Sequence, residues 1–174
     1  HSGGEFANTS FTSNVQDLIA AADFLRKTYA APQLLVGHSL GGAAVIAAAP
    51  AIAEATAVAT IAAPADPEHV TRLFTGKHGE IAQAGKAEVE IAGRTFTVSR
   101  QFLDDIAGRT LHDDLAGLRK ALLVFHAPRD TVVGIDNATR IFTAAKHPKS
   151  FVSLDDADHL LSRRADAIYV AKVL

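Results

Sequence analysis

Apolar residues recur along the 174-residue chain with two different periods, one typical of helices and the other of buried strands. Between Phe11 and Tyr29 they recur at helical spacing after the polar pair Thr9-Ser10, which predicts a capped helix. Residues 33–36 form a short, largely apolar run, as in strands buried in parallel sheets. The same reasoning predicts strands at 57–62, 120–126 and 150–154, and helices at 40–49, 136–146 and 160–173.

The alternation of strands and helices predicts an α/β fold. Such a pattern is typical of three layers, with helices on both faces of a mostly parallel sheet and right-handed crossovers between strands. Residues 68–118 interrupt the pattern, because they are richer in charges and glycines, and two short runs around Ala92-Gly93 (88–91 and 95–98) predict a β-hairpin. We therefore expect one domain over residues 1–174 that carries an insertion at 68–118.

Charge and composition narrow the classes of function. The chain has 17 Lys and Arg against 19 Asp and Glu, and no basic cluster exceeds Arg163-Arg164, so we expect no nucleic-acid partner. It contains no cysteine, which excludes disulfides, thiolate metal sites and thiol redox chemistry in this chain and fits a cytoplasmic location. Segment 43–65 carries a single charge, but its alanine-rich composition, Pro50 and Glu54 argue against a membrane helix.

The run Gly37 to Gly42, with the sequence GHSLGG, stands between a predicted strand and a predicted helix. This context is typical of a nucleophile elbow, where the serine occupies a strained turn and glycines two residues to either side avoid collisions. The backbone N–H of Leu40, at the helix N-terminus, would then face an oxyanion, and Gly42 would let the helix approach the sheet closely. Ser39 is therefore the predicted nucleophile. The alternative is that Ser39 only caps the helix.

A nucleophilic serine needs a histidine base and a carboxylate that orients the base. In hydrolases built on this elbow, the chain order is serine, acid, histidine. Asp130 follows the third predicted strand and His159 the fourth, so both lie at the sheet edge where loops converge. Asp136 is the second choice for the acid. The simpler alternatives are that Asp130 is a turn residue and His159 an ordinary loop histidine.

Other polar residues near these motifs have simpler interpretations. We expect His38, which flanks the serine, and His126, at the end of a strand below the acid loop, to be packing residues. The aspartates of residues 155–158 beside His159 are a ligand type that cations prefer, but no second cluster completes a coordination sphere. We therefore expect no metal site, and the sequence implies no cofactor.

On these residues the chain resembles the α/β-hydrolase fold superfamily. More narrowly, it resembles the hydrolase domain that in some bacterial proteins precedes an osmotically-inducible-protein-C-like domain. The resemblance covers essentially the whole chain and rests on residues 2–9, 31–35, 37–42, 63–70, 134–138 and 145–151. It implies that Ser39, Asp130 and His159 form the catalytic triad, in agreement with their chain order, and that residues 68–118 are a lid.

The resemblance also implies parts that precede and follow this sequence. Hydrolase domains of this type begin with several strands before residue 2, and a loop between those strands supplies the second N–H of the oxyanion hole. We therefore expect the strand at 33–36 to be an exposed sheet edge, and this chain, which starts at His1 rather than at Met, to be part of a longer protein. The implied partner is a fused C-terminal osmotically-inducible-protein-C-like domain, which would carry any redox cysteines.

The function expected from the sequence is that of a serine hydrolase, which cleaves an ester or related acyl bond of a small-molecule substrate through an acyl-enzyme. Ser39 would attack, His159 would take its proton, and Asp130 would orient His159. The Leu40 N–H would stabilise the oxyanion. Large apolar residues of the insertion are candidates for an acyl pocket or for core packing: Leu73, Phe74, Phe96 and Phe102. The alternative is a non-catalytic hydrolase-like module that serves as an interaction partner for a fused redox domain.

Overall fold

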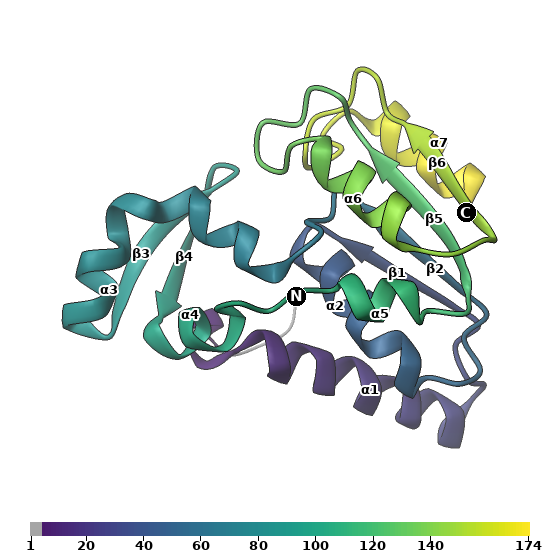
Figure 1. Cartoon of the computed structure of the whole chain (residues 1–174), viewed down its shortest axis with the longest axis horizontal. Coiled ribbons are helices and arrows are strands. Elements are labelled where there is room, and N and C mark those ends of the chain that lie inside the picture. The colour runs from purple at the N-terminus through teal and green to yellow at the C-terminus, as the bar shows by residue number, and fades with distance from the viewer. Residues whose placement is uncertain (1–4) are drawn as a thin grey trace.

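The structure, a computed structural model, describes residues 5–174 and contains two sheets (Figure 1). A parallel sheet has the strand order β1-β2-β5-β6, and an antiparallel pair is formed by β3 and β4. The strands are β1 Leu34–His38, β2 Ala57–Ile61, β3 Lys86–Ile91, β4 Arg94–Ser99, β5 Ala121–His126 and β6 Lys149–Ser153. The α-helices are α1 Phe11–Thr28, α2 Leu40–Ala48, α3 His78–Ala84, α4 Arg100–Ile106, α5 His112–Ala116, α6 Asp136–Ala144 and α7 Arg164–Val173. Short 3-10 segments are η1 Phe6–Asn8, η2 Ala49–Ala51 and η3 Pro67–Lys77.

The parallel sheet separates helices into two outer layers, which confirms the predicted α/β fold. Because side chains alternate between the faces of a strand, Val58 and Val124 join the large core cluster that also holds buried residues of α2 and α6. Ala59 and Phe125 point to the opposite face and pack in a second cluster with Val170 of α7. Figure 1 shows α7 and α6 flanking the β5–β6 side of the sheet.

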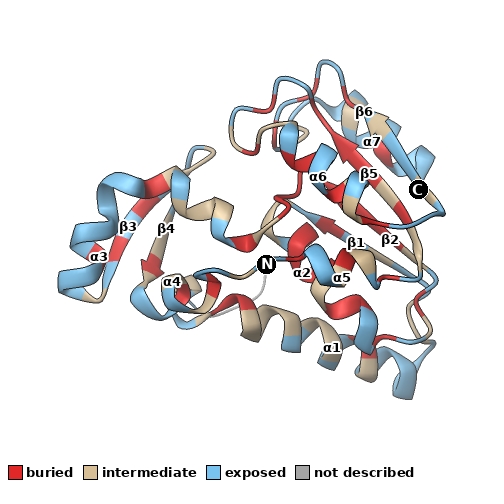
Figure 2. Cartoon of the chain, viewed as in Figure 1, coloured by how far each residue is buried: buried red, intermediate tan, exposed pale blue. Residues whose placement is uncertain are grey.

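Small residues let α2 lie directly on the sheet. Ala43, Ala44 and Ala48 are buried on this helix, whereas α1 leaves much of its outer surface exposed (Figure 2). The start of α1 follows from its cap: the Ser10 hydroxyl accepts the backbone N–H of Ser13, and the Ser13 hydroxyl accepts the N–H of Ser10. Of the two predicted capping residues, Thr9 and Ser10, it is therefore Ser10 that caps the helix.

Part of the segment between β2 and β5, residues 67–106, lies beside the parallel sheet, at the left of Figure 1. We call these residues the lobe. The predicted hairpin is confirmed, with Ile91 opposite Arg94 and Val89 opposite Phe96 around the turn Ala92-Gly93. Buried lobe residues, among them Phe102, belong to the same apolar cluster as Val58 of the parallel sheet. The lobe and the sheet therefore share one core.

Three details differ from or sharpen the sequence prediction. Strand β1 continues through Gly37 to His38, because both residues pair with β2, so the expected end at residue 36 was wrong. Helix α7 begins at Arg164 and not at residue 160, since Leu161 has a positive φ of 52° and the N–H of Ser162 bonds to the Asp158 carboxylate. As expected, β1 is an outer strand of the sheet among the described residues.

Candidate active site

Ser39 lies on a sharp turn between β1 and α2. Its backbone has φ 53° and ψ −130°, a conformation that a residue with a side chain adopts only under strain. The turn is fixed from both sides, because the Ser39 N–H donates to the Ile61 carbonyl at 2.8 Å and the Gly42 N–H donates to the Ser39 carbonyl at 2.8 Å. The Leu40 N–H is in the first turn of α2, where backbone donors have no partner within the helix.

The glycines around this turn have different roles. A Cβ on Gly37 would lie 2.3 Å from the Gly41 carbonyl oxygen, and one on Gly42 would lie 2.5 Å from the Ala63 Cβ. Gly41 has open space at that position. The expectation that glycine is needed two residues to either side of the serine thus holds for Gly37 and was wrong for Gly41. Gly42 is the second required glycine, and it permits the predicted close approach of α2.

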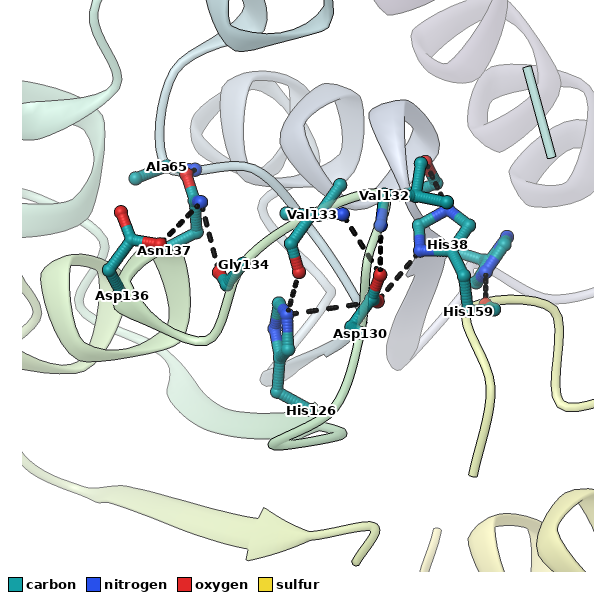
Figure 3. Close-up of polar contacts among 11 residues, drawn as sticks. His38, Ala65, His126, Asp130, Val132, Val133, Gly134, Asp136, Asn137 and His159 are labelled. Carbon is teal, nitrogen blue, oxygen red and sulfur yellow. Dashed lines mark hydrogen bonds and ion pairs between the residues drawn. The ribbon is translucent and has the colours of Figure 1, made fainter. Parts of the chain in front are cut away.

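The structure brings the three predicted residues together in one hydrogen-bonded series. The Ser39 Oγ lies 3.0 Å from His159 Nε2. His159 Nδ1 lies 2.8 Å from Asp130 Oδ2 (Figure 3). Because the carboxylate only accepts, Nδ1 carries the proton of a neutral His159 ring, and Nε2 is left as the acceptor for the Ser39 hydroxyl. This is the geometry that a general base requires.

Asp130 is buried, and its carboxylate is held by both backbone and side chain. Oδ1 accepts the N–H groups of Val132 and Val133 at 2.8 and 2.9 Å, while Oδ2 faces His159. Burial alone would raise the pKa of Asp130, but the hydrogen bonds from His159 and from the two amides outweigh it, and the pKa lies below its usual value. Asp130 is therefore a fixed negative charge behind His159 at neutral pH.

The sequence matches a known protein family over nearly its whole length. The match is to the alpha/beta hydrolase family and covers residues 1–171. The chain belongs to the alpha/beta hydrolase family. The esterase domain of a Rhodothermus marinus protein is 47% identical, with a TM-score of 0.79, and the match covers 97% of this chain and 69% of that chain.

Two further hydrolase structures share the fold at low sequence identity. The alpha/beta hydrolase domain-containing protein 10 from mouse is 21% identical, with a TM-score of 0.76 and coverage of 98% of this chain and 70% of that chain. The monoacylglycerol lipase of Paleococcus ferrophilus is 16% identical, with a TM-score of 0.67 and coverage of 99% and 77%. No match was found among curated proteins.

The second candidate for the acid lies elsewhere in this hydrolase fold. Asp136 is the first residue of α6, and its carboxylate is 3.5 Å from the side-chain nitrogen of Asn137. Asn137 in turn donates to the Gly134 carbonyl and accepts the N–H of Ala65 (Figure 3). The structure therefore groups Asp136 with the loop that enters α6, and it is Asp130 that contacts His159.

Two further histidines contact the loops that carry these residues. His38 Nε2 donates to the carbonyl oxygen of His159 at 2.7 Å, and desolvation lowers the pKa of His38 from 6.5, so the ring is neutral at neutral pH. His126 is fully buried, and its Nε2 donates to the Val133 carbonyl at 2.8 Å. The expectation that His38 is a packing residue was wrong, because its side chain is exposed, whereas His126 is buried as expected. In the sequence, only the positions of His38 beside Ser39 and of His126 before the acid loop hinted at these contacts. The residues that the two rings contact could not be predicted, because His159 is distant in sequence and Val133 lies in a loop.

A cavity of about 220 Å³ opens beside Ser39, between the elbow and the lobe. It is lined almost entirely by apolar side chains, and the four predicted pocket residues are among them. The lining comprises Phe6, His38, Ser39, Leu40, Gly41, Pro64, His69, Val70, Leu73, Phe74, Ile91, Phe96, Val98, Phe102 and Val133. Phe74 and Phe102 are also buried in the core, so for these two the expected alternatives of pocket lining and core packing both apply.

Within residues 5–174, no three His, Cys, Asp or Glu side chains gather as the ligands of a metal would, and the aspartates of residues 155–158 form no such group. None of the helices over the same residues has the length and apolar character needed to cross a membrane.

Proposed function

We propose that the protein is a serine hydrolase that cleaves an ester or related acyl bond of a small molecule through an acyl-enzyme. The observation that carries this proposal is the hydrogen-bonded series from Ser39 Oγ through His159 to the buried Asp130 carboxylate. The serine stands on a strained strand-to-helix turn, as the serine of a nucleophile elbow does. The 47% identity to a domain described as an esterase gives further support.

The proposed reaction has two halves. In the first, Ser39 Oγ attacks the carbonyl carbon as His159 Nε2 takes its proton, and the Leu40 N–H donates to the oxyanion that forms. The C–O bond to the alcohol then breaks, and His159 gives its proton to the departing oxygen. In the second half, water attacks the Ser39 ester while His159 again acts as base, which releases the acid and restores the serine.

Asp130 has a supporting role in this proposal. Its charge holds the Nδ1–H tautomer of His159 and stabilises the imidazolium that exists while the proton is in transit. Because the two amides from Val132 and Val133 fix Oδ1, only Oδ2 is directed at the ring. The lobe would act as the lid over the substrate.

The test is hydrolysis of a p-nitrophenyl ester by the protein and two serine variants. In Ser39→Ala, kcat/KM should fall by about a thousandfold or more, because without the Ser39 hydroxyl His159 has no nucleophile to activate and no acyl-enzyme can form. Ser150→Ala is the matched control, since Ser150 is exposed on β6, and it should retain the wild-type rate. Equal rates in wild-type and Ser39→Ala protein would contradict the proposal. Rates at the uncatalysed level in both proteins would favour a non-catalytic interaction module.

A further inference from the structure

The cavity beside Ser39 is lined by a few polar groups and many apolar ones. Ser39 and His38 belong to the elbow, whereas much of the apolar lining comes from lobe side chains and from Phe6. The centroid of the Phe6 ring lies 5.4 Å from that of Phe96 and 5.5 Å from that of Phe102. A group covalently attached to Ser39 Oγ would therefore extend from the elbow into a space enclosed by aromatic and aliphatic side chains.

The cavity offers no charge to a ligand. Asp, Glu, Lys and Arg are absent from the described residues that line it. The ionisable rings are His38 and His69, and desolvation lowers the pKa of both from 6.5, so both are neutral at neutral pH. A carboxylate placed there would lose its hydration without gaining a cationic partner, which is unfavourable. The cavity therefore suits an uncharged apolar group.

The volume limits the size of that group. A cavity of about 150 Å³ in another protein holds one benzene molecule, with six carbon atoms. By the same ratio, about 220 Å³ holds roughly nine carbon atoms. An acetyl group would leave most of the space unfilled, and a palmitoyl group would exceed it. A linear acyl group of intermediate length, or a short one that ends in a phenyl ring, fits best.

We propose that this cavity is the acyl site and that the preferred substrates are esters of uncharged, apolar acids of medium size. This proposal rests on the proposed hydrolase function. It assigns the acyl group, and not the alcohol, to the space under the lobe, and it assigns chain-length selectivity to Leu73 and Phe96, two half-buried residues of the wall.

A series of p-nitrophenyl esters tests the proposal, because only the acyl group varies. From acetate through butyrate to octanoate, kcat/KM should rise by about two- to fourfold for each added methylene that becomes buried. It should fall again for palmitate. The p-nitrophenyl ester of succinate has an acyl group of four carbons, like butyrate, but with a carboxylate in place of the terminal methyl. It should be hydrolysed at least tenfold more slowly than the butyrate ester.

Two tryptophan variants locate the site. Leu73→Trp should fill part of the cavity and lower kcat/KM for octanoate by about tenfold or more, while acetate changes little. Thr75→Trp is the matched control, since Thr75 lies on the same 3-10 segment but is exposed and does not line the cavity. It should leave the whole chain-length profile unchanged.

The outcomes separate this proposal from the proposed function. A flat or falling profile from acetate to octanoate, with hydrolysis that still depends on Ser39, would overturn the acyl site and leave the hydrolase function intact. Equal loss for every ester in Leu73→Trp would also overturn it. If no ester is hydrolysed, calorimetric binding of octanoyl and acetyl esters to Ser39→Ala is decisive: tighter binding of the octanoyl ester supports the cavity, and equal or absent binding contradicts it.

A second inference comes from the buried histidine behind the acid. His126, at the end of β5, donates from Nε2 to the Val133 carbonyl, while its Nδ1 has no hydrogen-bond partner among the described residues. The N–H of the same Val133 donates to Asp130 Oδ1 (Figure 3). The Val133 carbonyl thus accepts a hydrogen bond from His126, and the Val133 amide donates one to Asp130.

We infer that His126 is a positioning residue for Asp130. A buried nitrogen without a partner costs stability, so a leucine or phenylalanine would be the better choice if the site only had to be filled. The donor at Nε2 explains the histidine, since it fixes the loop that directs the Asp130 carboxylate at His159. The ring lies 3.9 Å from Asp130 Oδ2, so it touches the acid only at long range and acts through Val133.

Two substitutions distinguish positioning from packing. His126→Phe fills the space without a donor, and it should lower kcat by about tenfold or more with KM changed less than twofold. His126→Gln offers an amide donor at a similar reach, and it should restore kcat to within about threefold of wild type. Thermal unfolding of both variants is measured in parallel. If kcat follows the melting temperature in both, or if the glutamine gives no rescue, His126 is a packing residue and the inference is wrong.

Discussion

The parallel-sheet frame and the lobe contribute to the same site in different ways. In the frame, each proposed catalytic group is held through the backbone: the Ser39 N–H by Ile61, the Asp130 carboxylate by two amides, and the His159 carbonyl by His38. The lobe instead contributes apolar side chains that line the cavity and are held by packing, as Phe96 is against Phe6 of η1. The reacting geometry is therefore rigidly defined, whereas the shape of the acyl site depends on replaceable apolar groups.

The largest expected difference is in turnover. Asp130→Asn should lower kcat by about ten-thousandfold, because the neutral amide no longer fixes the tautomer of His159. Phe96→Ala, in the lobe, should leave kcat for acetate esters near wild type and lower kcat/KM for octanoate by about tenfold. Steady-state kinetics with both esters measures this contrast. A decrease in kcat of less than tenfold in Asp130→Asn would show that the frame does not control turnover as proposed.

The next difference is within the frame itself, at two glycines of the elbow. Gly37→Ala should lower the free energy of unfolding by about 3 kcal/mol or more, because its Cβ would lie 2.3 Å from the Gly41 carbonyl oxygen, a backbone atom. Gly41→Ala should raise stability by about 0.5–1 kcal/mol, since open space surrounds that position in a helix. Urea unfolding measures the free energy of unfolding of both variants. Equal changes in Gly37→Ala and Gly41→Ala would show that the elbow is not tightly packed.

A smaller effect concerns acid stability. The pKa of Asp130 is lower in the folded protein than the value of about 3.9 expected in the unfolded chain, so the folded state binds fewer protons between the two values. Asp130 therefore contributes stability that is complete above about pH 4 and is lost as the pH falls through the folded pKa. The free energy of unfolding, measured from pH 5 downward, should decrease less steeply in Asp130→Asn. Identical slopes would contradict this assignment.

The smallest effect is expected where the lobe joins the frame. Asp66 forms an ion pair with Arg140 of α6 and accepts the N–H of Leu111, which follows the lobe. Arg140 is half exposed, so Arg140→Ala should cost less than about 1 kcal/mol of stability. Asp66→Ala also leaves the Leu111 N–H without its acceptor and should cost about 1–3 kcal/mol. A larger loss in Arg140→Ala would show that the ion pair, and not the backbone contact, secures the lobe.

Much of the frame was predictable because its signals are local. The apolar runs of the four parallel strands, the small residues of α2 and the sequence around Ser39 all lie within short stretches. The chain order of Ser39, Asp130 and His159 was informative because the carboxyl ends of parallel strands meet at one edge, so residues far apart in sequence converge there.

What the sequence could not provide depends on contacts between distant segments. Whether Gly41 or Gly42 must be a glycine depends on which side of α2 faces Ala63, a residue beyond the following strand. The contacts of His38 and His126 are with carbonyl oxygens, which every residue carries, so no sequence pattern marks them. The start of α7 depends on the positive φ of Leu161, which its side chain does not favour.

The most direct test of the account is covalent labelling of the protein with a fluorophosphonate, followed by mass spectrometry of its peptides. The reagent reacts with serines that a neighbouring base has activated, so the adduct should be on Ser39. It should be absent from Ser39→Ala, strongly reduced in His159→Ala and unchanged in Ser150→Ala. An adduct on another residue, or equal labelling of wild-type and Ser39→Ala protein, would contradict the claim that Ser39 is an activated nucleophile.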